Sequence, residues 1–568
     1  MKKLLALGLL GAVAACGGDD SGRVTFSDPF CAEVMPRVQD WVDQQREANP
    51  VPDDPRYGGT VVAGGIGELP DGMNAAVSGS YEARQHQQFV NLMPLVQYDE
   101  NIEPEPYLAE SWEVSDDGTE LTFHLRDDVY WHDGERTDAH DVAFTYLAVT
   151  DLESVFPNTT FWKFYVRGSE GVEVIDDFTV RIRLQPHSEF LDAWTTLGIM
   201  PEHLLGDVPP AEMAQHPFGS VCPVGNGPFV YVSHAPQDRW VFDANPAFPA
   251  ELGGRPFLDR YIYRVIPEAA TLLTELLTEN IDIYVAPTPD QVARIEAADH
   301  LDFNSFTSRN YVMVVWNSRR PQLSDARVRR ALTMGTNRRE IVEAILQGYG
   351  TLANSSVPPF HWAYDPDIDG IEHDPEGAAA LLEEAGWVDG DGDGVRENAQ
   401  GQRLSIVLKY NQGNQNRQNV AEIMQAQLAS IGVEIQPQVV EFGTLLQQIN
   451  SAELRDFDGV VIGWVTEFKL DDTDLFHSDR IDQPYAWSGT DNAEIDRLID
   501  TLAVTVDREE AGPLWAGYQE ALIEEQPYTF FYFPQRLVGS NVRLQNLVMD
   551  QRGEWVNIRE WHIDPASR

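Results

Sequence analysis

The spacing of hydrophobic residues changes along the chain between two patterns, which predict strands and helices. Between Leu121 and Leu125 every second residue is apolar, as in a strand with one buried face. Between residues 420 and 431 apolar residues recur three or four positions apart, which is the spacing of one helical face, and Gly432 ends that helix. Strands that alternate with helices in this way favour an α/β architecture.

Other segments extend this pattern. Apolar runs predict further strands at residues 60–63, 311–316, 433–440, 459–464 and 529–533. Helices are expected at 38–47, 324–334, 338–346 and 495–502. Thr137 and Ser324 are the expected N-caps of helices, because a hydroxyl there accepts a hydrogen bond from the first turn.

The N-terminus has the pattern of an export signal. Two lysines precede an apolar run of 12 residues from Leu4 to Ala15, which is shorter than the roughly 20 residues that span a bilayer. Val13–Cys16 resembles a bacterial lipobox, so we expect residues 1–15 to be a lipoprotein signal peptide and Cys16 to carry the lipid. A plain secretory signal cut near Ala15 is the alternative. Residues 16–57 then form a tether and an N-terminal extension.

Charge narrows the choice of partners. The chain has 40 Lys and Arg against 91 Asp and Glu, a formal charge of −51. Such a balance excludes the basic surface that nucleic acids require. The remaining sequence has no apolar run long enough to span a membrane. We therefore expect an extracytoplasmic, monomeric body attached to the membrane through lipid alone, with no nucleic-acid partner.

Three cysteines are present, and lipidation of Cys16 leaves Cys31 and Cys222. Outside the cytoplasm thiols are oxidised, so these two are predicted to form a disulfide that attaches the extension to the body. Two unpaired thiols are the alternative.

Residues 107–146 carry the most distinctive series of turns, strand and helix. This segment resembles the signature of the family 5 extracellular solute-binding proteins, the peptide and nickel receptors of ABC importers. Further matches follow in the same order at 198–205, 223–229, 325–332 and 385–387. The resemblance runs from about Gly58 to the C-terminus.

The resemblance implies a periplasmic binding protein-like α/β fold of type II, cluster C. In this Venus flytrap, two lobes close over a ligand about two hinge strands, and an extra domain elaborates one lobe. The hinge strands are expected near Asn310–Asn317 and Tyr528–Pro534. The expected division is domain I at 58–75, 197–310 and 530–568, domain II at 76–196, and domain III at 311–529.

The implied function is a receptor that captures peptides by lobe closure and delivers them to a permease and its ATPase subunits. The alternative is the same fold binding a non-peptide solute, such as an oligosaccharide or a nickel chelate. An enzyme is not expected, because no GxSxG elbow and no HExxH helix occur. The chain also has no P-loop, so ATP hydrolysis would belong to its partners.

The resemblance also points to one ligand-binding position. In peptide-binding members, a Gly-Trp strand end is followed, three residues after the Trp, by an Asp that pairs with the α-ammonium of the peptide. Here Trp464 is followed by Glu467. A carboxylate and an ammonium form charge-assisted hydrogen bonds. The alternative is that Glu467 is a solvated loop acid.

Six further residues are candidates for the ligand site. Trp464, Tyr485 and Trp487 would stack on ligand side chains without selecting a single one, although each could equally be ordinary packing. The other candidates, in the first lobe, are Ser78, Ser80 and Tyr81.

One loop resembles the start of a calcium-binding loop. Asp389, Asp391 and Asp393 take positions 1, 3 and 5, and Gly394 takes position 6. Position 12 is Gln400 instead of the bidentate Glu. An acidic turn without metal is the alternative, and no other cofactor is expected.

Overall fold

The computed structural model of the protein describes residues 28–70, 72–77, 80–150, 166, 170–185, 187–189, 191, 194–451 and 455–567. The expected signal peptide, the lipidated Cys16 and the candidate Ser78 lie outside the described residues. No helix of the described part combines the length and the apolar character needed to cross a bilayer.

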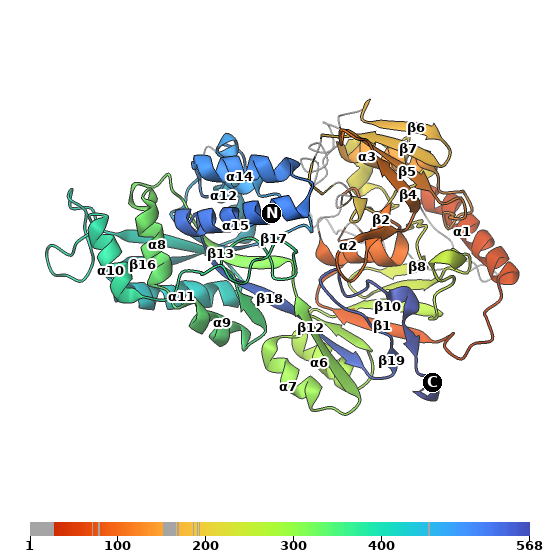
Figure 1. The fold of residues 1–568 in the computed structure, drawn as a ribbon. Coiled ribbons are helices and arrows are strands. Elements are labelled where there is room, and N and C mark those ends of the chain that lie inside the picture. The colour runs from red at the N-terminus through yellow and green to blue at the C-terminus, as the bar shows by residue number, and fades with distance from the viewer. Residues whose placement is uncertain are drawn as a thin grey trace, which may run out of the picture.

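A 12-stranded sheet runs through both halves of the molecule (Figure 1). In the first half its strands are β1 (Thr60–Gly65), β8 (Phe229–Ala235), β9 (Arg239–Ala244), β10 (Arg260–Val265), β11 (Ile283–Val285) and β12 (Leu301–Thr307). In the second half they are β13 (Asn310–Trp316), β14 (Gly350–Leu352), β15 (Ser405–Asn411), β16 (Glu434–Val440) and β17 (Gly459–Val465). The long strand β18 (Tyr528–Asn541) belongs to both.

Two crossings connect the halves. The first part of β18, up to Pro534, pairs with β13 and β14, and its last part pairs with β11 and β12. The second crossing is the turn from β12 into β13 through Ser308 and Arg309. The strands expected at the hinge are therefore both present, and β18 is longer than its apolar run because its later residues enter the first half. The expected domain boundary at residue 530 lies inside this strand.

Both faces of the second-half sheet are covered, which explains why β13 is apolar throughout. Val312, Val314 and Trp316 lie in one core, whereas Tyr311 and Met313 lie in the other. The first core is covered by α8 (Ala326–Met334), α9 (Arg338–Leu346), α10 (Pro375–Glu384) and α11 (Gln415–Ala429). The second is covered by α12 (Phe442–Asn450), α13 (Thr473–Phe476), α14 (Ala493–Val504) and α15 (Arg508–Glu525).

The first half has a second sheet, of four strands in the order β4-β5-β7-β6. These strands are β4 (Ala109–Val114), β5 (Glu120–Leu125), β6 (Val172–Asp176) and β7 (Thr179–Arg183), with α3 (Ala139–Thr150) packed on them. Leu121, Phe123 and Leu125 are buried, as the alternating pattern predicts. Smaller elements of this half are α2 (Tyr81–His86), α5 (Glu202–Leu205), α6 (Ala269–Leu277), α7 (Pro289–Glu296), β2 (Val96–Tyr98), β3 (Pro104–Pro106), β19 (Leu544–Gln545) and β20 (His562–Ile563).

Two predicted helix caps are wrong by one residue. Helix α3 is capped by Asp138, whose carboxylate accepts from the backbone N–H of His140 at 2.8 Å. The Thr137 hydroxyl accepts from Asn226 instead. Asp325, not Ser324, accepts from the first turn of α8. In both places a carboxylate directly follows the hydroxyl and reaches the N–H groups that lack partners in the helix.

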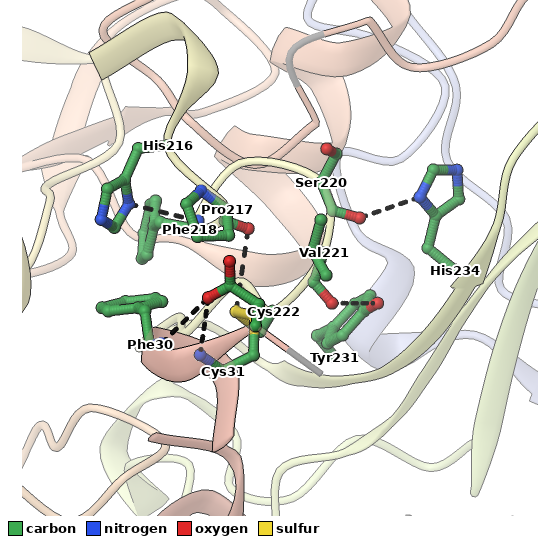
Figure 2. Close-up of a disulfide and its surroundings, with 11 residues drawn as sticks. Phe30, Cys31, His216, Pro217, Phe218, Ser220, Val221, Cys222, Tyr231 and His234 are labelled. Atoms are coloured by element: carbon green, nitrogen blue, oxygen red, sulfur yellow. Dashed lines mark hydrogen bonds between the residues drawn. A yellow bond between two sulfur atoms is a disulfide. The ribbon is translucent and has the colours of Figure 1, made fainter. Parts of the chain in front are cut away.

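The N-terminal extension forms α1 (Pro29–Ala48), which is longer than the predicted 38–47 because Asp28 caps it and Pro29 stands at its first position. Figure 2 shows Cys31, near the start of this helix, joined to Cys222. The Cα atoms of the two cysteines are 5.6 Å apart. The structure thus joins the two cysteines that the sequence pairs. Further along the helix, Arg37 forms an ion pair with Asp133 at 2.8 Å. Helix α1 is therefore attached to the first half by both covalent and ionic contacts.

Candidate functional site

Glu467 lies where the two halves meet, just after β17. Its carboxylate contacts Arg84 Nη1 at 3.4 Å and Arg309 Nη1 at 3.2 Å. Arg84 comes from α2 in the first half, and Arg309 occupies the crossing between β12 and β13. A contact to each of these segments places Glu467 beside the hinge.

The charges around Glu467 keep it ionised. Burial alone would raise its pKa, but Arg84 and Arg309 together hold the pKa below its ordinary value. The Arg309 guanidinium also lies 4.6 Å from the ring centroid of Phe468. The carboxylate predicted to take a ligand ammonium thus has two guanidinium partners from the chain itself. An incoming ammonium must share Glu467 with them or displace one of them.

Trp464, Tyr485 and Trp487 form one aromatic cluster. Trp464 makes edge contacts with Tyr485 at 5.4 Å and with Trp487 at 5.5 Å between ring centroids. Trp487 is only 2% exposed, and its indole N–H donates to Asn450 at 2.7 Å. Trp487 is thus part of the core and supports the two half-buried rings, which are the ones that a ligand could touch.

The first-lobe candidates have structural partners. The Ser80 hydroxyl caps α2 by accepting from Ala83 N–H at 3.3 Å. The Tyr81 hydroxyl donates to Glu554 at 2.9 Å, and burial raises the pKa of Tyr81. Arg536 covers the Tyr81 ring and pairs with Glu554 at 2.6 Å. These contacts fix α2, and with it Arg84, relative to β18.

A cavity of about 760 Å³ lies between the halves next to Phe468. Residues from the β2–β3 region of the first half line one side, and segments of the second half line the other. Lining side chains that carry rings or charges are Tyr98, Glu100, Glu103, Glu189, Phe360, His361, Trp362, Phe468 and Arg508. None of the predicted ligand residues that the structure describes lines this cavity, although Glu467 directly precedes Phe468.

The halves also touch at the edge of the cavity. Arg508, at the start of α15, pairs with Glu103 and lies 3.4 Å from Glu189. Trp362 donates its indole N–H to Glu189 at 3.1 Å. We call Glu103, Glu189, Trp362 and Arg508 the clasp, because they connect the halves away from the hinge.

Comparison with known proteins decides the family. Residues 103–480 match the profile of the bacterial extracellular solute-binding proteins, family 5. The chain belongs to this family. It is accordingly a solute-binding protein rather than an enzyme, and its fold is the two-lobed type II binding-protein fold that the sequence predicts.

Similar proteins differ in what they bind. The oligopeptide-binding protein AppA of Bacillus subtilis is 30% identical over 90% of this chain and 92% of its own length. Its structure with a nonapeptide superimposes with a TM-score of 0.76, over 90% of this chain and all of that one. NikZ of Campylobacter jejuni, in complex with Ni(L-His), is 24% identical, with a TM-score of 0.74 over 89% and 99% of the two chains. Heme-binding protein A of Haemophilus influenzae is 26% identical over 79% and 82%.

The acidic loop of this family 5 protein gathers four carboxylates. Ligand atoms of Asp389, Asp391, Asp393 and Glu397 lie within 4.8 Å of one another. Asp393 pairs with Arg403, which a cation would have to displace. Calcium binding stays a prediction. It is tested by whether calcium raises the melting temperature of the parent protein but not that of Asp391→Asn.

Sequence patterns missed the partners of Glu467 and the clasp. Arg84 is 383 residues from Glu467, and Arg508 is 405 residues from Glu103. No local spacing joins residues so far apart. One of these residues could have been found from its place in the sequence. Arg309 directly precedes the predicted hinge strand of this solute-binding protein.

Proposed function

We propose that this protein captures peptides between its two lobes and delivers them to an ABC permease and its ATPase subunits. The observation that carries the proposal is the position of Glu467, an ionised carboxylate at the junction of the halves, in the place that the family resemblance assigns to the peptide α-ammonium. The likeness to AppA, whose structure holds a nonapeptide, supports the same ligand class.

Lobe closure explains how such a receptor signals. A ligand that contacts both halves can do so fully only when they are closed, so binding shifts the population toward the closed form. A permease that distinguishes closed from open receptors would then accept loaded ones. The hinge at β18 and at the turn before β13 supplies the two crossings about which the halves would move.

We further propose that the protein acts as a monomer held to the membrane by lipid on Cys16. A Cys16→Ser variant should leave the membrane fraction and appear in the soluble extracytoplasmic fraction. Fractionation followed by immunoblotting measures this directly. A variant that stayed in the membrane fraction would contradict a lipid attached at Cys16.

The experiment that tests the ligand class is mass spectrometry of the molecules released from the purified protein by mild denaturation. Peptides should be recovered. Recovery of an oligosaccharide or a nickel chelate without peptides would support the alternative ligand and overturn the proposal. The non-peptide alternative is included because similar proteins are named for Ni(L-His) and heme.

A further inference from the structure

The interlobe cavity has an unbalanced set of charges. Among the lining residues that the structure describes, three carry carboxylates, Glu100, Glu103 and Glu189, and Arg508 is the one Lys or Arg. His361 adds no positive charge, because burial and the nearby Arg508 lower its pKa to about 3. The described lining is therefore negative at neutral pH.

Aromatic rings form much of the remaining wall. The Tyr98 and Phe468 centroids lie 5.0 Å apart in an edge contact, and Phe360 lies 6.2 Å from Phe468. Trp362 completes the set. Aromatic faces attract cations through their quadrupole, and the attraction grows when water is excluded. Rings together with carboxylates thus favour positively charged groups over neutral or negative ones.

Arg508 shows that this combination accommodates a guanidinium. Its guanidinium carbon lies 5.2 Å from the ring centroid of Trp362. Two carboxylates from the opposite half contact the same group, those of Glu103 and Glu189. Arg508 thereby neutralises part of the negative charge of the cavity. The Glu100 side chain, which lines the same cavity, is exposed.

We propose that the cavity receives a cationic side chain of the ligand, so that the protein prefers peptides containing Lys or Arg to neutral or acidic ones. This proposal rests on the proposed function and specifies its ligand class. The cationic group would lie between the aromatic wall and Glu100, while Arg508 keeps its own partners. The α-ammonium at Glu467 would be a separate contact, because Glu467 precedes Phe468 in the chain but does not line the cavity.

The test compares three synthetic peptides that differ at one position, which carries Lys, Gln or Glu. Affinities for ligand-free protein are measured by calorimetry at about 0.15 M salt, where the Debye length of roughly 8 Å screens distant charges. The Lys peptide should bind about five- to thirtyfold more tightly than the Gln peptide, and the Glu peptide should bind least tightly.

A pair of charge-reversal variants separates the cavity from the overall charge. Glu100→Lys should remove most of the preference for the Lys peptide. Glu343→Lys makes the same change on the exposed face of α9, away from the cavity, and should leave the preference intact. Loss of the preference in both variants would attribute it to overall charge and overturn the proposal.

The remaining outcomes distinguish this inference from the function on which it rests. Equal binding of the three peptides, or tighter binding of the Glu peptide, would overturn the cationic preference and leave a peptide receptor. If none of the peptides bound, while a non-peptide solute co-purified with the protein, both proposals would be wrong.

Discussion

Asp472 is buried close to the second-half core, where it accepts hydrogen bonds from Ser356 at 2.5 Å and from Tyr518 at 2.7 Å. Burial raises the pKa of Asp472, and the two hydrogen bonds lower it. The effect of burial is the larger, so the pKa is about 6. The folded protein therefore holds this proton more tightly than the unfolded chain does. The stabilisation present at low pH is lost as the pH rises from about 4 through 6.

Asp472→Asn should consequently stabilise the protein near neutral pH relative to the parent. The amide stays uncharged, so the cost of ionising a buried acid, about 3 kcal/mol for this rise in pKa, disappears. Melting temperatures measured at pH 4.5 and pH 7.5 should show a more favourable difference at the higher pH. The exposed Asp299→Asn serves as the control. An identical difference at both pH values would contradict the raised pKa.

Some residues of the candidate site could be predicted from the sequence, and others could not. Glu467 could be chosen because the strand end before it, Gly463-Trp464, is a local pattern. Its two guanidinium partners could not, since nothing local to Arg84 or Arg309 records a contact with a residue far along the chain. For Trp487 the sequence leaves ligand contact and ordinary packing equally open, because an aromatic residue in a loop gives no local sign that the core will bury it.

At the scale of elements, strands and helices could be predicted more closely than their ends. Strand β13 and helix α9 match the apolar spacing almost residue for residue, because burial of one or both faces imposes that spacing. The start of a helix such as α3 or α8 depends on which of two neighbouring polar side chains accepts a hydrogen bond from its first turn. Helix α1 starts earlier than its apolar spacing predicts, because Asp28 caps it and Pro29 takes its first position.

The disulfide should make a measurable contribution to stability. It closes a loop of 191 residues, and removing such a cross-link typically lowers the free energy of unfolding by about 2–5 kcal/mol. A Cys31→Ser, Cys222→Ser double variant should therefore unfold at lower denaturant concentration. Because reduction removes the same bond, the parent with reductant should match the variant without it. A variant as stable as the oxidised parent would contradict this role.

For the whole molecule, the proposed closure would depend on contacts at two places, the hinge region around Glu467 and the clasp around Arg508. Arg508→Ala removes the contacts to Glu103 and Glu189 and should speed ligand release about two- to fivefold, the size expected of a partly exposed ion pair. Stopped-flow dissociation measures it. Arg497→Ala, which removes an exposed pair with Glu494 within α14, should leave the rate unchanged.

If Arg508→Ala and Arg497→Ala released ligand at the same rate, the clasp would not hold the closed form.

The arrangement of the halves was predictable only through the family resemblance. The long apolar strands indicate buried sheets, but they do not indicate that β18 serves both halves.

The central claim is that Glu467 anchors a peptide between the lobes, and calorimetry on ligand-free protein tests it most directly. The peptide recovered from the purified protein is titrated into the parent, Glu467→Ala and the surface control Glu343→Ala, after melting curves establish that each is folded. Losing a partly buried charged partner should weaken binding about thirtyfold or more in Glu467→Ala, with Glu343→Ala unchanged. Binding by Glu467→Ala as tight as by the parent would contradict the claim.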